Sequence, residues 1–264
     1  MVKKIRAIVE KELEYMATLY PFDPKPYYDT RLLYASGLLF LCRDNLAGKK
    51  GSREWKILNL AAGIELLGLG CGFHNFDMPE GSKKILGQDQ DRYTLNLLFG
   101  DVLYSRAINY LVKFEDMLIF DEVINSLKSI HKARLSLYGD LLKLKEKKIS
   151  IENILEDRVG ALLSINSLFK NSFLIGYSIF PPPWPRDLAG DISYIYRFVN
   201  HITLLKSCRE LEELLKATGF MEMDALEDKK NFIKDQLDDI IAQLKIDWLQ
   251  RRLTGQVNQL WDRI

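Results

Sequence analysis

The sequence predicts an all-α protein, and two observations support this fold class. Leu, Ile and Phe recur at steps of three and four residues through most of the 264 residues, which is the spacing of one apolar helix face. Runs that alternate apolar and polar residues, as strands do, are nearly absent. The predicted helices cover residues 31–41, 57–70, 93–114, 151–169, 191–215 and 231–253.

Short segments of helix-breaking residues separate the predicted helices. They lie at residues 21–26 (PFDPKP), 47–51 (AGKKG), 78–81 (MPEG), 181–185 (PPPWP) and 218–220 (TGF). None of them is a long polar linker, and we find no repeat of about 20–50 residues. We therefore expect a single all-helical domain over residues 1–264, with roughly eight helices of ordinary length.

Segment 57–70 is predicted to be the central helix, because it is apolar on more than one side. Four glycines, Gly63, Gly68, Gly70 and Gly72, lie in it or just beyond it, and each costs about 1 kcal/mol relative to alanine inside a helix. Close packing against another helix would offset this cost. A lumen that must stay open beside the helix would also explain the glycines.

Composition excludes several classes of function. The net charge is +1, so there is no broad basic face for nucleic acid. The three cysteines lie far apart without CxxC spacing, which argues against a disulfide framework and a zinc site and suits a reducing compartment. Residues 1–16 carry acidic side chains, unlike a signal or transit peptide. No uninterrupted apolar run reaches the roughly 18 residues of a membrane span. We expect a cytoplasmic protein with no transmembrane segment.

The familiar catalytic motifs are absent from the sequence. His74, His131 and His201 lie on separate predicted helices without HxxxH or HExxH spacing, so we interpret them as structural histidines. No GxSxG or Walker A motif occurs, and the glycines of LGLGCG (67–72) follow no strand. Asp238 and Asp239 lie on the polar side of an amphipathic helix, which indicates a solvated face.

Two segments nevertheless resemble the trans-polyprenyl diphosphate synthases. They are AAGIELLGLGCGFHNFDMPEG (61–81) and LNLLFGDVLYSRAINYLVKFED (95–116). In that family an AAxIELIHxxxLIHDD helix ends in a DDxxD motif, and LxGDxLxxxAxxxL opens a later helix. Here Ile64, Glu65 and Leu66 match the first helix, His74 matches the histidine before DDxxD, and Gly100–Asp101 match the second. The resemblance is strongest over 61–116 and weaker over 117–215.

The resemblance implies a helical bundle in which two aspartate-rich motifs hold three Mg²⁺ ions. The ions bind the diphosphate of an allylic substrate and promote its departure. Isopentenyl diphosphate then attacks the allylic cation that remains. This sequence has no carboxylates at the matching positions. The first motif falls on Asn75, Phe76 and Pro79, and the second falls on Asn200, His201 and Leu204.

Other matching positions have changed as well. Tyr28 stands where the family has the lysine that grips isopentenyl diphosphate, whereas Lys83, Lys84 and Arg158 are cationic remnants whose binding of diphosphate is open. The chain is therefore most similar to the small, non-catalytic component of bacterial heptaprenyl or hexaprenyl diphosphate synthases. That similarity implies a catalytic large subunit as partner, with DDxxD motifs, Mg²⁺ and a prenyl diphosphate product for menaquinone. This chain would itself bind no cofactor.

The same resemblance implies positions for two further functions. Gly68, Gly70 and Cys71 would line the tunnel for the growing tail, where small residues suit a long product. Tyr104 and Leu111, in an aromatic- and Leu-rich stretch, would lie at the interface with the partner. Three alternatives stay open: a divergent active prenyltransferase, a homodimeric protein that binds an isoprenoid or another lipid, and an unrelated helical bundle.

Overall fold

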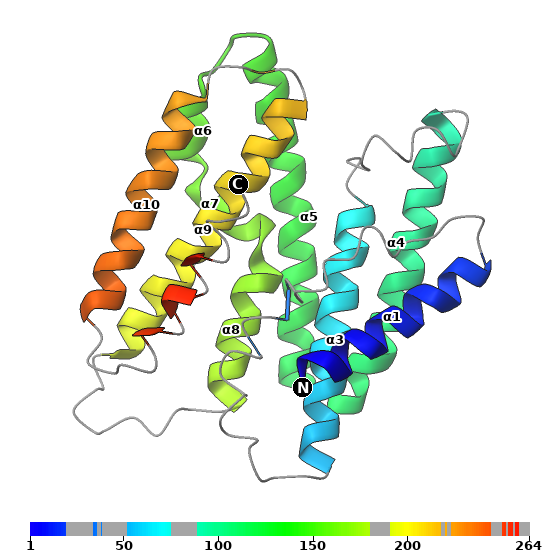
Figure 1. Cartoon of the computed structure of the whole chain (residues 1–264). Coiled ribbons are helices and arrows are strands. Elements are labelled where there is room, and N and C mark those ends of the chain that lie inside the picture. The colour runs from blue at the N-terminus through cyan, green and yellow to red at the C-terminus, as the bar shows by residue number, and fades with distance from the viewer. Residues whose placement is uncertain are drawn as a thin grey trace. The chain divides into compact units, whose positions relative to one another are not determined.

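The computed structural model is helical and has no strand in the residues it describes (Figure 1). This confirms the all-α prediction. The described residues are 1–19, 34, 35, 38, 52–74, 89–179, 191–217, 220, 223–243, 250, 251, 253–255, 257 and 258.

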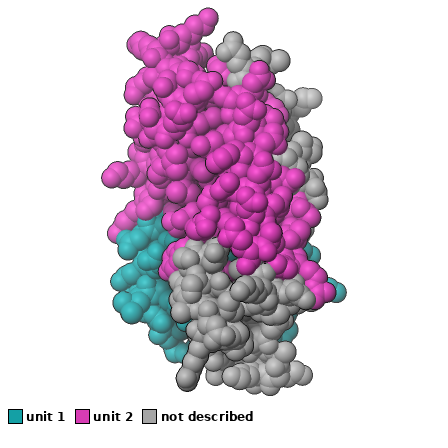
Figure 2. Space-filling model, turned by 90° about the vertical axis from the view of Figure 1, so that its left-hand side faces the viewer, with its two compact units in different colours: residues 1–127, 171–180 teal, residues 128–170, 181–264 magenta. Residues whose placement is uncertain are grey.

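The chain divides into two compact units, which Figure 2 shows in different colours. The first comprises residues 1–127 and 171–180, and the second comprises 128–170 and 181–264. The boundaries fall inside two helices, α5 (Met117–Lys145) and α8 (Ser167–Ile179), so each of these helices contributes to both units. The single domain expected over 1–264 stays a prediction.

Helix α3 (Ser52–Phe73) is the core of the first unit. Every residue from Ile57 to Cys71 is buried, which confirms the prediction of a central helix. Helix α4 (Asp89–Leu111) packs along it most extensively, and α1 (Val2–Leu19) also covers it. A 3₁₀ turn, η3 (Val112–Phe114), connects α4 to α5.

Helix α3 is also long and apolar enough to cross a membrane. An 18-residue window within Glu54–Phe73 has a mean hydropathy of 1.4, and 89% of that window is buried inside the chain. The core helix of a soluble protein passes the same test. In the described part of the chain, a second candidate arises only if α7 and α8, bent by 72°, are counted as one span.

The second unit contains α6 (Ile151–Asp157), α7 (Val159–Ile165), α9 (Asp191–Ala217) and α10 (Asp224–Gln243). Helix α9 packs against α10 and α7, and α6 packs against α10. Lys230 of α10 is buried, and its Nζ lies 2.7 Å from Glu212 of α9 and 2.6 Å from Glu227.

One continuous helix predicted over 151–169 is broken twice in the structure. The breaks lie at Arg158 and Asn166, where the backbone leaves helical geometry (φ −112° and −115°) although neither is glycine or proline. The Asn166 side chain donates to Ser207 Oγ at 2.9 Å and to Glu210 at 3.0 Å, and it accepts from Lys206 at 2.5 Å. Tertiary hydrogen bonds to α9 therefore stabilise the second break. The spacing of apolar residues in the sequence gives no sign of such bonds.

Candidate functional site

His74 directly follows the last residue of α3 and is held against α4. Its backbone N–H donates to Gly70 O at 3.1 Å, and its Nε2 lies 3.3 Å from Asp101 Oδ1. The imidazole packs on the backbone of Gly100 so closely that a Cβ there would overlap the ring. It also lies 4.7 Å, centroid to centroid, from the ring of Tyr104. The histidine and the Gly–Asp pair that the resemblance singled out therefore lie in contact, as parts of a helix-to-helix joint.

Three of the four glycines of α3 have a side chain packed against the position where their own Cβ would lie. A Cβ added at Gly68 would overlap the ring of Tyr34, one at Gly70 would lie 2.6 Å from the ring of Tyr104, and one at Gly63 would lie 2.7 Å from Leu111. Close packing, the first of the two explanations, accounts for these three glycines.

Cys71, the third expected tunnel residue, is buried, and its Sγ accepts a hydrogen bond from Tyr104 at 3.5 Å. In this structure tyrosine rings fill the space beside Gly68 and Gly70. The tunnel wall stays a prediction, and a product tail there would require these rings to move.

Tyr104 and Leu111, the expected interface residues, face inward. Leu111 is 2% exposed and packs on Gly63, and the Tyr104 ring packs on Gly70 and His74. A partner could not meet Leu111 on a folded surface. The outward apolar residues of α4 and η3 are Leu98, Ile108 and Val112, which are 40–53% exposed. The interface expected at Tyr104 and Leu111 stays a prediction, and Leu98, Ile108 and Val112 are the more exposed apolar positions of the same segment.

The first degenerate motif, Asn75, Phe76 and Pro79, lies outside the described residues, as do Lys83, Lys84 and Tyr28. The second motif lies on α9. Asn200, His201 and Leu204 are partly buried there, and His201 Nδ1 is 2.7 Å from Arg197 O, one turn earlier on the same helix. In the described part of the chain, no group of three or more His, Cys, Asp or Glu residues could hold a metal ion.

Arg158, the expected diphosphate remnant, is engaged in an ion pair. Its Nε donates to Asp140 Oδ2 at 2.7 Å, and Lys143 Nζ lies 3.1 Å from the other oxygen of the same carboxylate. The hydrogen bond from Arg158 lowers the pKa of Asp140, although burial opposes this effect. The pair links α5 to the break between α6 and α7. Whether Arg158 also binds diphosphate stays open.

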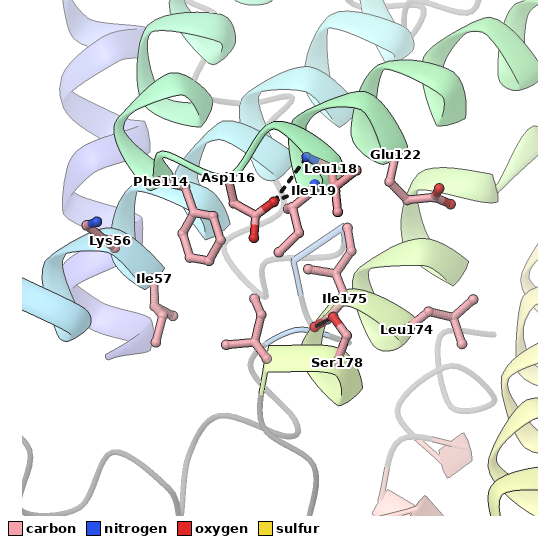
Figure 3. A pocket seen from close by; sticks show the side chains of 11 residues that line it. Lys56, Ile57, Phe114, Asp116, Leu118, Ile119, Glu122, Leu174, Ile175 and Ser178 are labelled. Carbon is pink, nitrogen blue, oxygen red and sulfur yellow. Dashed lines mark hydrogen bonds between the residues drawn. The ribbon is translucent and has the colours of Figure 1, made fainter.

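A pocket of about 680 Å³ lies at the other end of α3, where α3, η3, α5 and α8 meet (Figure 3). Ile57 at this end and His74 at the other are separated by about 25 Å of helix. Most of the residues that line the pocket are aliphatic or aromatic: Ile57, Phe114, Leu118, Ile119, Leu174, Ile175 and Ile179.

The polar side chains around the pocket already have partners within the chain. Lys56 pairs with Glu115 at 2.6 Å, and Asp116 accepts from the backbone N–H groups of Leu118 and Ile119. Glu122 accepts from Asn171 at 2.8 Å. Because these groups are committed, the pocket offers chiefly apolar surface, and hydrocarbon is the chemistry that fits it.

Sequence reasoning missed the structural role of Glu65. This glutamate is 1% exposed, and its Oε2 accepts from the backbone N–H groups of Tyr34 and Ala35, each at 2.9 Å. A lone acid in the middle of an apolar helix was the available signal, because a buried carboxylate needs donors.

A second buried acid was also missed. Glu12 of α1 accepts from Arg106 at 2.5 Å and from Tyr110 at 2.6 Å, which attaches α1 to α4. Burial and the hydrogen bond to Glu12 raise the pKa of Tyr110 to about 12. The pocket was missed too, since its lining comes from four separate segments.

Comparison with known proteins gives a similarity to a solved structure. No family model and no curated protein matches the chain. Among solved structures, a decaprenyl diphosphate synthase from Rhodobacter capsulatus matches with a TM-score of 0.61. The match covers 99% of this chain and 95% of that one at 15% sequence identity. The chain has the helical isoprenoid-synthase fold. The predicted fold class is thus confirmed, and at this identity the similarity concerns the fold alone.

Proposed function

We propose that this chain is a non-catalytic subunit of a heteromeric medium- or long-chain polyprenyl diphosphate synthase. The main observation behind the proposal is the identity of three residues on α9. Asn200, His201 and Leu204 occupy the positions at which the resemblance implies magnesium ligands. Mg²⁺ prefers carboxylate oxygens, so an amide, an imidazole and an aliphatic side chain form a poor set. In the sequence, Asn75 and Phe76 replace the first two aspartates of the other motif in the same way.

The partner in this proposal is a large subunit that carries two DDxxD motifs. Mg²⁺ bound there would stabilise the negative charge of the diphosphate as it leaves. The complex would work in the cytoplasm and make the side chain of menaquinone. This chain would contribute an interface and apolar surface beside the growing prenyl chain, and it would thereby help to set the product length.

The pocket supports the second part of the proposal. Its volume, its largely apolar lining and its internally paired polar groups suit a hydrocarbon chain better than a polar metabolite. The same pocket also favours a second candidate, a homodimeric protein that holds an isoprenoid or another lipid without chemistry. Lipid that co-purifies with the chain in the absence of any partner would favour this candidate.

Restoring carboxylates tests the proposal. The variant Asn75→Asp/Phe76→Asp, assayed alone with allylic diphosphate, isopentenyl diphosphate and Mg²⁺, is expected to be inactive, because the positions on α9 would still hold no carboxylate. In complex with the catalytic subunit it should turn over like the wild type. Turnover by the isolated wild-type chain at a rate near that of the complex would refute the proposal.

A further inference from the structure

The second half of α5 carries an apolar stripe on its exposed face. Leu135, Tyr138 and Leu142 are 76%, 61% and 48% exposed. At 3.6 residues per turn, Leu142 lies about 20° and Tyr138 about 60° around the helix from Leu135, so the three form one stripe about 10 Å long. The opposite face of the same segment is buried, with Ile130, Ala133, Leu137 and Leu144 in the core of the second unit.

Basic side chains flank this stripe on both sides. Lys132 and Lys143 lie about 60–80° to one side of Leu135, and Lys145 lies about 80° to the other. All three lysines are exposed. Residues 128–148 contain seven Lys and Arg against two acids, a net charge of +5 in a chain whose total is +1.

The two acids of this segment offset only part of its positive charge. Asp140 is buried and paired with Arg158 and with Lys143, and Glu146 lies 2.6 Å from Lys148. The surface around Leu135 is therefore apolar at its centre and positive at its edges. A matching surface must be anionic and must also accept aliphatic side chains.

We propose that residues 128–148 form a docking surface for an anionic lipid bilayer. Exposed Leu and Tyr side chains between flanking lysines are the pattern of helices that lie in the headgroup region, with the lysine stems extending toward the phosphates. The stripe alone is much smaller than the roughly 800 Å² that each partner of a stable protein interface usually buries. A bilayer needs no such area, because it deforms around the stripe and adds long-range attraction to the lysines.

Vesicle flotation with the full chain tests this proposal. We expect binding to vesicles of phosphatidylcholine with phosphatidylglycerol, weak binding to phosphatidylcholine alone, and release as salt is raised. Lys132→Glu/Lys145→Glu and, separately, Leu135→Gln/Leu142→Gln should each lower the affinity by about tenfold or more.

Phe232 on α10 provides the matched control. It is 57% exposed in the same unit, but Asp228, Asp235 and Asp239 are exposed nearby on its helix. The variant Phe232→Gln should bind vesicles like the wild type. All variants change exposed side chains, so their melting temperatures should match that of the wild type, which separates lost docking from lost folding.

Three results would overturn the proposal. They are wild-type binding that ignores lipid charge, vesicle binding that survives both stripe variants, and no vesicle binding at all. If the wild type ignores vesicles while the same variants lose an acidic protein partner, the stripe belongs to a protein interface and the lipid assignment is wrong.

Discussion

The ring of Tyr104 occupies the space that a side chain at Gly70 would need. A Cβ at Gly70 would lie 2.6 Å from ring carbons of Tyr104 and 3.1 Å from the backbone oxygen of Gly100. Two central helices of the first unit, α3 and α4, thus approach each other at a glycine on each side, with Tyr104 and His74 packed into the joint.

Gly70→Ala should therefore destabilise the protein. The new methyl group meets a backbone oxygen that cannot rotate away, so we expect the free energy of unfolding to fall by about 1–3 kcal/mol in urea denaturation. Gly72→Ala is the matched control, because Gly72 is exposed and has no neighbour within 4 Å. That variant should be neutral or more stable by up to about 1 kcal/mol. Equal losses in both variants would contradict the packing account.

Cys71→Phe tests the expected tunnel wall. If Cys71 borders the product tail in the complex, the variant should shorten the product while turnover continues, because we propose that the metals bind to the other subunit. If Cys71 only packs against Tyr104, the complex should lose stability by overpacking. A stable variant complex with an unchanged product distribution would rule out the tunnel.

Substitutions on α4 should separate folding from assembly. Leu111→Asp places a charge in the core and should cost more than about 3 kcal/mol, with loss of helical circular dichroism. Ile108→Asp, on the exposed face, should keep the fold and weaken capture of the catalytic subunit. If Ile108→Asp captures the subunit as well as the wild type does, this face of α4 is not the interface.

The pair formed by Asp140 and Arg158 should make stability depend on pH. The pKa of Asp140 is lowered in the folded chain, so its contribution is present above the ordinary carboxyl pKa near 3.8 and is lost as pH falls through the lowered value. The difference in unfolding free energy between wild type and Asp140→Asn should be constant above about pH 5 and shrink below it. A difference independent of pH would contradict the assignment.

Glu65 should be essential for attaching the segment at Tyr34 and Ala35. Glu65→Leu removes the acceptor of two backbone N–H groups, each worth about 1–3 kcal/mol when left unpaired and buried. Glu65→Gln keeps one side-chain oxygen and should lose much less. Thermal unfolding of the two variants measures the difference, and equal losses would argue against the hydrogen bonds.

The central helix could be predicted because its signal is local. An apolar sequence on all sides indicates burial wherever the helix lies, and Ile57–Cys71 is buried throughout. Helix α5 shows the opposite case and was absent from the predicted helices. Its exposed apolar residues, Met117, Leu118 and Leu135, obscure the one-sided pattern that periodicity detects.

The parts of the site that depend on tertiary contacts could not be predicted. The break at Asn166 is fixed by side chains about 40 residues away in the sequence, and the pocket is assembled from four elements. The Leu111 side chain points inward because α4 packs against α3 at Gly63. The local sequence pattern does not indicate this packing. That Asn200 and His201 are not carboxylates, in contrast, is evident from residue identity alone.

The most direct test of the central claim is incorporation of labelled isopentenyl diphosphate into an allylic diphosphate with Mg²⁺. It should be measured for the isolated chain, for a DDxxD-bearing catalytic subunit, and for their mixture. We predict no incorporation by the isolated chain and full incorporation by the mixture. Incorporation by the isolated chain at a rate near that of the mixture would contradict this prediction.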